Sequence, residues 1–345
     1  MRSAITIASL FCAMPAVAQD PAAQQVPAFT LPPSSQLSAE ARQVLARMAA
    51  ARSPDFKGDI AKSRAFFQRY NDDRLAEMRR HFQTSERETT IAGVPVHIVT
   101  PRSGVAARQR RRVLINIHGG AFMWGSGSGA LVEAIPIAAV MGIEVVTVDY
   151  RLTPENRYPA ASEDVTTVYR ALLKNHRAAA IGIYGCSAGG IITAQATAWI
   201  RKQGLPRPGA IGTFCGTGAP YSGDGPYLAG PTTGSGPAPV DPLPGTLPTA
   251  YLAGIAAGDP LAYPMTSREE IAAMPPTLLL AGSRDFAASA LTLAHRRLSA
   301  AGVSSELHLF DGLPHAFFVW PDMPESIEAY RLIANFFDRH LKPGR

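Results

Sequence analysis

The chain has 345 residues, of which 46% are hydrophobic and 17% are charged, and its formal net charge is +6. Charged residues usually make up about 25% of a globular chain, so this composition excludes a disordered protein, which combines low hydrophobicity with high net charge. The 30 glycines and 29 prolines indicate many turns, but they follow no Gly-X-Y period, which excludes a collagen.

The N-terminus has the pattern of an export signal. Met1 and Arg2 precede an apolar stretch from Ala4 to Met14, and the small-x-small sequence Ala16-Val17-Ala18 follows. This pattern predicts a signal peptide over residues 1–18, cleaved after Ala18, and a periplasmic or secreted mature protein. The alternative is a buried or membrane-anchoring helix, but a span needs roughly 20 apolar residues and this stretch is shorter. Since no other stretch is long and apolar enough, we expect no stable insertion in a membrane.

Residues 19–84 precede the first extended core strands. Residues 19–36 are rich in proline and alanine, which predicts a flexible segment. Ser38 is a candidate N-cap for a helix through Met48, and a second helical pattern runs from Ile60 to Phe82 with a break near residues 70–72. Two helices ahead of an alternating strand–helix pattern do not belong to that pattern, so we expect them to form a cap.

From Arg87 onward the hydrophobic pattern changes to that of strands. Glu88–Ile91 and Val94–Val99 predict an antiparallel pair that turns at residues 92–93. Apolar runs then alternate with helical segments, and the last helix is expected over Pro324–His340. The runs are Val113–Ile117, Ile143–Val148, Ile181–Tyr184, Ala210–Phe214, Thr277–Leu280 and Ser305–Phe310. Such runs predict an α/β fold with a mostly parallel central sheet and helices on both faces.

A segment rich in glycine and proline interrupts this alternation at residues 219–265. A structureless loop of this length inside a compact domain is unusual and is often a functional lid. We therefore expect a core built from residues 85–218 and 266–345, with residues 219–265 as a cap insertion.

Neither an arginine-rich run nor the two cysteines of the expected core is assigned to a functional site. Arg108–Arg112 contains four arginines, but no aromatic residues interleave with them and no nucleic-acid motif accompanies them, so we expect a solvated loop and no nucleic-acid partner. Cys186 and Cys215 both follow expected buried strands. Export permits a disulfide between them, and two free buried thiols are the alternative.

The sequence Gly185-Cys186-Ser187-Ala188-Gly189 carries the clearest chemical signal. It follows an expected strand and precedes an expected helix, the context of a nucleophile elbow. The two glycines remove side chains that would collide where strand and helix approach. Ser187 is therefore the candidate nucleophile, placed at the carboxyl end of its strand, where ligands bind in open α/β sheets.

A serine nucleophile needs a base and a group that orients the base. Asp285 and His315 each follow an expected strand downstream, in the chain order Ser, Asp, His. A parallel sheet would bring both to the same edge as Ser187, so we predict a Ser187–Asp285–His315 triad. Asp311 competes for the aspartate position, but it is expected to shape a turn with Gly312. The remaining histidines are expected to serve no catalytic role.

The sequence His118-Gly119-Gly120-Ala121-Phe122 follows the strand at Val113–Ile117. Glycines there let backbone N–H groups approach a substrate oxygen, so the segment is a candidate oxyanion loop. We expect Gly119 and Gly120 to donate together with the Ala188 N–H. Which two of Gly119, Gly120 and Ala121 donate stays open, and His118 is expected to hold the loop.

Five segments in this order resemble the hormone-sensitive-lipase-like family of α/β-hydrolases, in particular its bacterial acetyl-esterase and lactone-hydrolase-like members. They are HGGAF (118–122), DYRLTPENRYPAA (149–161), GCSAGG (185–190), GSRD (282–285) and LPHAFF (313–318). The resemblance implies an α/β-hydrolase fold with a helical cap, the same triad and no cofactor. It also implies structural roles for Asp149, Arg151 and Glu155. No Cys/His spacing resembles a zinc site, so we also expect no metal. The sequence departs from the family pattern at Ala121, Cys186 and Ala288.

These observations together predict an exported serine carboxylic-ester hydrolase for short- to medium-chain acyl esters of small molecules. Phe122, Trp124 and Phe317 are candidate pocket residues, with core packing as the alternative for each. A lactonase, an amidase or an aryl-ester hydrolase would use the same triad. A non-catalytic ligand-binding protein on this scaffold is a further alternative, and the oligomeric state stays open.

Overall fold

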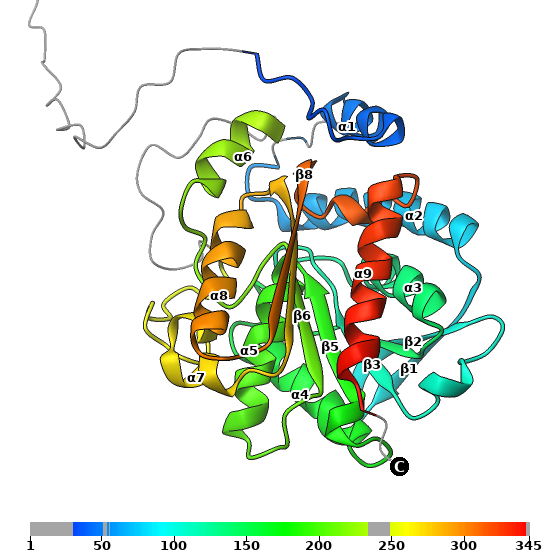
Figure 1. Ribbon diagram of the computed structural model, residues 1–345, viewed down its shortest axis with the longest axis vertical. Coiled ribbons are helices and arrows are strands. Elements are labelled where there is room, and N and C mark those ends of the chain that lie inside the picture. Colours follow the sequence, from blue (N-terminus) through cyan, green and yellow to red (C-terminus); the bar gives the residue numbers. More distant parts are fainter. Residues whose placement is uncertain (1–29, 51–53, 55, 234–248, 343–345) are drawn as a thin grey trace, which may run out of the picture. The chain divides into compact units, whose positions relative to one another are not determined.

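The computed structural model of the protein describes residues 30–50, 54, 56–233 and 249–342. Within these ranges, strands form one sheet in the order β1-β2-β4-β3-β5-β6-β7-β8 (Figure 1). The strands are β1 (Thr84–Ile91), β2 (Val94–Pro101), β3 (Val113–Ile117), β4 (Val145–Val148), β5 (Ile181–Cys186), β6 (Ala210–Phe214), β7 (Thr277–Arg284) and β8 (Ser305–Pro314). The predicted signal peptide lies outside the described residues.

The α-helices lie between and around the strands. They are α1 (Ala39–Ala50), α2 (Ile60–His81), α3 (Ser128–Met141), α4 (Ala160–Leu172), α5 (Ala188–Lys202), α6 (Gly225–Thr233), α7 (Arg268–Ala273), α8 (Ala288–Ala300) and α9 (Pro324–His340). None of the helices in the described part of the chain has both the length and the apolar composition needed to span a membrane.

The sheet is mostly parallel, as predicted. β1 and β2 pair antiparallel, β2 pairs antiparallel with β4, and each further neighbour pair from β4 to β8 is parallel. The last residue of β3, Ile117, lies opposite Gly185 near the end of β5. The carboxyl ends of β3, β5, β7 and β8 therefore lie on one edge of the sheet, and the segments that follow these strands build the candidate site.

Both faces of the sheet are covered by helices, because side chains of its strands alternate between two apolar clusters. In β5, Ile181 and Ile183 belong to the cluster that also holds residues of α4, α5 and α8. Tyr184 and Cys186 belong to the cluster that holds residues of α1, α2, α3 and α9. Figure 1 shows α8 and α9 on opposite sides of the sheet. The nearly continuous Val/Ile runs are explained by burial on both faces.

The two N-terminal helices begin at capping residues. Ser38 Oγ accepts the Ala41 N–H at the start of α1, and Asp59 accepts the Lys62 N–H at the start of α2. The predicted break near residues 70–72 is wrong, since α2 is continuous from Ile60 to His81. That stretch has no glycine or proline, and Gln68 donates to Asp72 one turn later, which supports the helix.

The insertion at residues 219–265 contains regular structure that its composition did not predict. Helix α6 covers Gly225–Thr233, and a 3₁₀ turn covers Pro264–Thr266. Residues 234–248 lie outside the described part, so the expected lid stays a prediction there. Tyr251 is buried and stacks on Phe122, which ties the end of the insertion to the core.

Candidate active site

Ser187 stands at a sharp turn between β5 and α5. Its backbone has φ 57° and ψ −121°, a strained conformation for a residue with a side chain, and its N–H donates to Phe214 O at 2.7 Å. The neighbouring glycines are required by close packing. A Cβ on Gly189 would lie 1.8 Å from Ile117 O, and a Cβ on Gly185 would lie 2.3 Å from the same oxygen. The elbow therefore has the predicted strand–turn–helix geometry.

Ser187, His315 and Asp285 form one hydrogen-bonded chain. His315 Nε2 lies 2.9 Å from Ser187 Oγ, and His315 Nδ1 lies 2.9 Å from Asp285 Oδ1. Asp285 is fully buried, and its Oδ1 also accepts the Ala287 N–H at 2.8 Å. With the proton on Nδ1, the imidazole offers Nε2 as acceptor for the serine proton. The structure thus brings together the three residues that the sequence singled out.

The histidine ring is held by more than the aspartate. Phe286 stacks on the His315 imidazole with ring centroids 4.2 Å apart.

Asp311, the competing carboxylate, bonds instead to Ser283 and Ser34 and belongs to β8, so it does not shape the expected turn. Cys215 Sγ lies within 4.8 Å of the Asp285 and His315 donor atoms, a spacing compatible with metal ligation. Burial raises the pKa of this thiol well above its ordinary value, which disfavours the thiolate that a metal needs.

The loop after β3 lies against the elbow and is fixed by its histidine. His118 is fully buried, its ring stacks on Tyr150, and its Nδ1 lies 2.7 Å from Gly119 O. Burial lowers the pKa of His118, so the neutral ring is favoured. The Tyr150 hydroxyl donates to His118 O. These contacts agree with a role of His118 in holding the loop.

One expected oxyanion donor is already engaged. The Gly119 N–H donates to Glu133 Oε1 at 2.7 Å, so its assignment to the oxyanion hole is wrong in this arrangement. By contrast, the N–H groups of Gly120, Ala121 and Ala188 donate to no residue in the described part of the chain. Gly120 has φ 113°, and a Cβ there would lie 2.0 Å from Trp124 O, which explains the glycine. Ala121, with φ 51°, adopts a strained left-handed conformation without being glycine.

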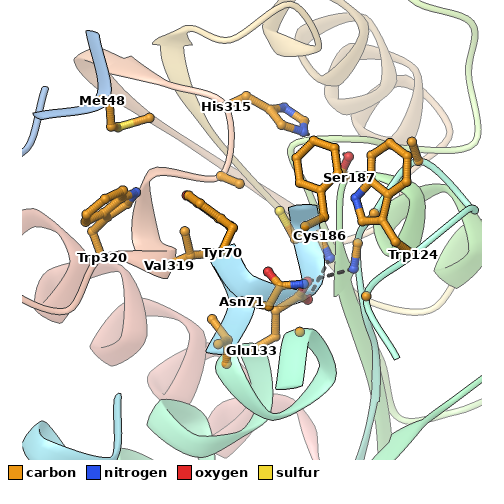
Figure 2. Close-up of a pocket in the computed structure, with 18 of the residues that line it drawn as sticks. Met48, Tyr70, Asn71, Trp124, Glu133, Cys186, Ser187, His315, Val319 and Trp320 are labelled. Carbon is orange, nitrogen blue, oxygen red and sulfur yellow. Dashed lines mark hydrogen bonds between the residues drawn. The ribbon is translucent and has the colours of Figure 1, made fainter. Parts of the chain in front are cut away.

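A cavity of about 380 Å³ opens beside Ser187 and His315 (Figure 2). Its other walls come from α1, α2, α3, the oxyanion loop and the segment before α9; they include Met48, Phe67, Tyr70, Asn71, Trp124, Glu133, Val319 and Trp320. Trp124, a candidate pocket residue, lines this cavity and stacks on Phe67 with ring centroids 4.2 Å apart. The volume lies near the lower end of the roughly 300–1,000 Å³ typical of small-molecule sites.

The other two candidate pocket residues do not line this cavity. Phe122 is buried against Tyr251, and Phe317 is fully buried against Phe310 and Phe318. Neither residue is therefore a wall of this cavity, and both rings pack in the core.

The residues that match the family signature at 149–161 make structural contacts. Asp149 accepts the Gly127 N–H and bonds His97. Arg151 pairs with Asp164. These interactions tie the chain after β4 to neighbouring elements and place none of the three signature residues beside Ser187.

Glu155 pairs through both oxygens with Arg64 of α2, which also donates to Met123 O beside the oxyanion loop. Together these contacts link α2 to the segment that follows the oxyanion loop.

Sequence inspection missed the residues that α2 and α3 bring to the site. Asn71 lies in the stretch where a helix break was expected, and Glu133 lies inside an otherwise apolar helix. A single carboxylate between Ser128 and Met141 was a usable signal, because an isolated charge is rarely buried without a partner. Figure 2 shows Glu133 below Cys186 and Ser187, with dashed hydrogen bonds at its carboxylate.

Comparison with known proteins agrees with this geometry. A family model described as alpha/beta hydrolase fold matches residues 114–319. An acetyl-hydrolase of Streptomyces hygroscopicus is 28% identical over 67% of this chain and 76% of its own length. A Mycobacterium tuberculosis protein with an acetyl-hydrolase name is 35% identical over 38% of this chain, and the match spans 42% of that relative.

Solved structures are similar over most of the chain. Esterase E25 superposes with a TM-score of 0.78 and 28% identity, covering 93% of this chain and 99% of that one. A hormone-sensitive lipase from a metagenome library gives a TM-score of 0.71 and 25% identity, covering 87% and 98%.

Proposed function

The chain belongs to the alpha/beta hydrolase fold family, and from that premise we propose that it is a carboxylesterase-like serine hydrolase. The observation that carries the proposal is the hydrogen-bonded chain from Ser187 through His315 to Asp285. Similarity to acetyl-hydrolases and to solved esterase structures supports an ester as the substrate.

In the proposed reaction, Ser187 Oγ attacks the ester carbonyl while His315 Nε2 takes the serine proton. Asp285 holds the imidazole by Nδ1 and stabilises the imidazolium that forms. The carbonyl oxygen becomes an oxyanion, for which Gly120, Ala121 and Ala188 offer N–H groups without other described partners. Collapse expels the alcohol, which takes the proton from His315 and leaves an acyl group on Ser187. Water, activated by His315, then releases the acid.

The cavity supports a small, uncharged acyl ester as substrate. Aromatic and aliphatic side chains form most of its walls, and the described residues that line it include no lysine or arginine. A carboxylate-bearing substrate would be buried there beside Glu133 without a cationic partner, which is costly. The modest volume favours short- to medium-chain acyl groups. The acetyl-hydrolase relative is consistent with the short end of this range.

We also propose that the protein is exported, with the signal peptide removed after Ala18. This proposal rests on the charged start, the apolar stretch and the small-x-small site. N-terminal sequencing of protein from the periplasm or the medium of a bacterial host tests it. A mature chain beginning at Gln19 is expected, and a full-length chain retained inside the cell would contradict it.

The hydrolase proposal is tested with p-nitrophenyl esters from acetate to palmitate, comparing the wild type with Ser187→Ala. We expect turnover of the shorter esters that falls with chain length and is abolished by the substitution. A folded wild type that hydrolyses none of them refutes the simple-esterase proposal. In that case, lactones and amides are the substrates to test next.

A further inference from the structure

Glu133 joins the two backbone segments that build the site. Its Oε1 accepts the Gly119 N–H at 2.7 Å, and its Oε2 accepts the Cys186 N–H at 3.3 Å. Gly119 immediately precedes Gly120, whose N–H donates to no described residue, and Cys186 immediately precedes Ser187. One carboxylate from α3 therefore bridges the oxyanion loop and the nucleophile elbow.

The Glu133 carboxylate also accepts a hydrogen bond from β3, and it lies close to Ser187. The Asn116 side chain of β3 donates to Glu133 Oε2 at 3.4 Å, and its amide oxygen Oδ1 accepts the Thr147 hydroxyl of β4 at 2.6 Å. A Cβ on Gly119 would lie 3.3 Å from both Glu133 Oε1 and Ser187 Cβ. Gly119 therefore lies between the Glu133 carboxylate and Ser187.

We propose that Glu133 is a positioning residue whose carboxylate sets the distance between the oxyanion donors and Ser187. The proposal rests on the proposed hydrolase function. Both oxygens are needed, because each accepts from a different segment. Protonation would convert one oxygen into a donor facing an N–H, and that link would be lost. The backbone N–H of Gly120 would then no longer be held against the position of the oxyanion.

Glu133 is half-buried at the wall of the cavity, and no cation among the described residues is placed to offset its charge. Burial raises the pKa of Glu133 to about 7, although the N–H donors oppose this shift. The other titratable groups around it are Tyr150, Tyr184 and Cys186, which carry no positive charge, and His315 across the cavity. A group serving packing alone would be less costly as an uncharged residue. A carboxylate at this position is explained if its two acceptor oxygens serve the reaction.

The sign of the pH effect follows from this arrangement. The ionised carboxylate accepts both N–H groups, so the ordered site is present above pH 7 and is lost as the pH falls through that value. His315 must also be deprotonated to act as base. Ionisation of Glu133 is a further requirement in the free enzyme, so it should add about one to the slope with which log kcat/KM falls toward acid pH.

The experiment compares Glu133→Gln with the wild type on p-nitrophenyl acetate across pH 5–9. Displacing reacting groups by about 1 Å costs about 100-fold in rate, so we expect kcat to fall about 100-fold with KM little changed. The acidic limb of the variant should be shallower than that of the wild type by about one unit of slope, since the glutamine cannot lose a proton. Glu328→Gln, an exposed position on α9, is the matched control and should keep the wild-type rate and profile.

Several results would overturn the proposal. A Glu133→Gln enzyme with the wild-type kcat and an unchanged acidic slope shows that the carboxylate does not position the site. If that variant does not fold, the wild-type profile decides: a kcat/KM that stays constant from pH 8 down to pH 6 contradicts the requirement for an ionised Glu133. Absence of any wild-type turnover would instead indicate failure of the hydrolase proposal.

Discussion

Substituting Gly189 by alanine tests whether the close approach of β3 to the elbow sets the geometry of the site. The added Cβ would lie 1.8 Å from Ile117 O, whereas real Cβ contacts below 3.0 Å essentially never occur. The end of β3 and the start of α5 must therefore separate by about 1.2 Å. This movement carries the oxyanion loop away from Ser187. A displacement of about 1 Å costs about 100-fold in rate, and such overpacking lowers the free energy of unfolding by about 1–3 kcal/mol.

The assay measures kcat for p-nitrophenyl acetate and the thermal unfolding midpoint of Gly189→Ala. Gly258→Ala is the control, because Gly258 is exposed and its added Cβ would meet nothing within 4 Å. We expect the control to match the wild type, and the Gly189 variant to be folded at low temperature but about 100-fold slower. Wild-type rate and stability in Gly189→Ala would refute the steric argument.

The remaining predictions concern the triad and the thiols. Asp285→Asn keeps the shape of the side chain but favours the wrong His315 tautomer, so kcat should fall about 10⁴-fold with little change in the melting temperature; a loss below tenfold would contradict this role of the aspartate. Burial raises the pKa of Cys186 to about 11 and also that of Cys215. Peptide mapping after iodoacetamide treatment at pH 8 should show both thiols reacting at least about 10-fold more slowly in native than in unfolded protein, and equal rates would show that they are not buried.

The strands could be predicted because burial on both faces of the sheet requires nearly continuous apolar runs in the sequence. Val113–Ile117 and Ala210–Phe214 agree with the structure residue by residue, since both are apolar runs buried on two faces. The last helix begins at Pro324, a residue that favours the first helical turn. The proximity of Ser187, Asp285 and His315 could be predicted because each residue directly follows a strand of the parallel part of the sheet, and the ends of these strands share one edge.

Other features depend on contacts between segments far apart in the sequence. The N–H of Gly119 is engaged because α3 brings Glu133 to it, and no local pattern around the oxyanion loop shows that. Phe122 points into the core because Tyr251, from the insertion, stacks on it. The unbroken α2 follows from its own side-chain pairs and its packing against α3, which outweigh the weak polar signal near residue 71.

The two buried cysteines illustrate a choice that tertiary structure decides. Export permits a disulfide, and the sequence left both states open. The structure has Cys186 and Cys215 as free buried thiols, with the Ala316 N–H donating to Cys215 Sγ. Their role in the fold is therefore packing beneath the nucleophile and the histidine.

The most direct test of the account is to trap the acyl-enzyme. Wild-type protein is mixed with p-nitrophenyl acetate, quenched with acid within milliseconds, and analysed by intact mass and peptide mapping. The account predicts one acetyl group per chain on Ser187, formed with a burst of p-nitrophenol and absent from Ser187→Ala. Turnover that continues in Ser187→Ala, or an acetyl group found on another residue during turnover, would contradict it.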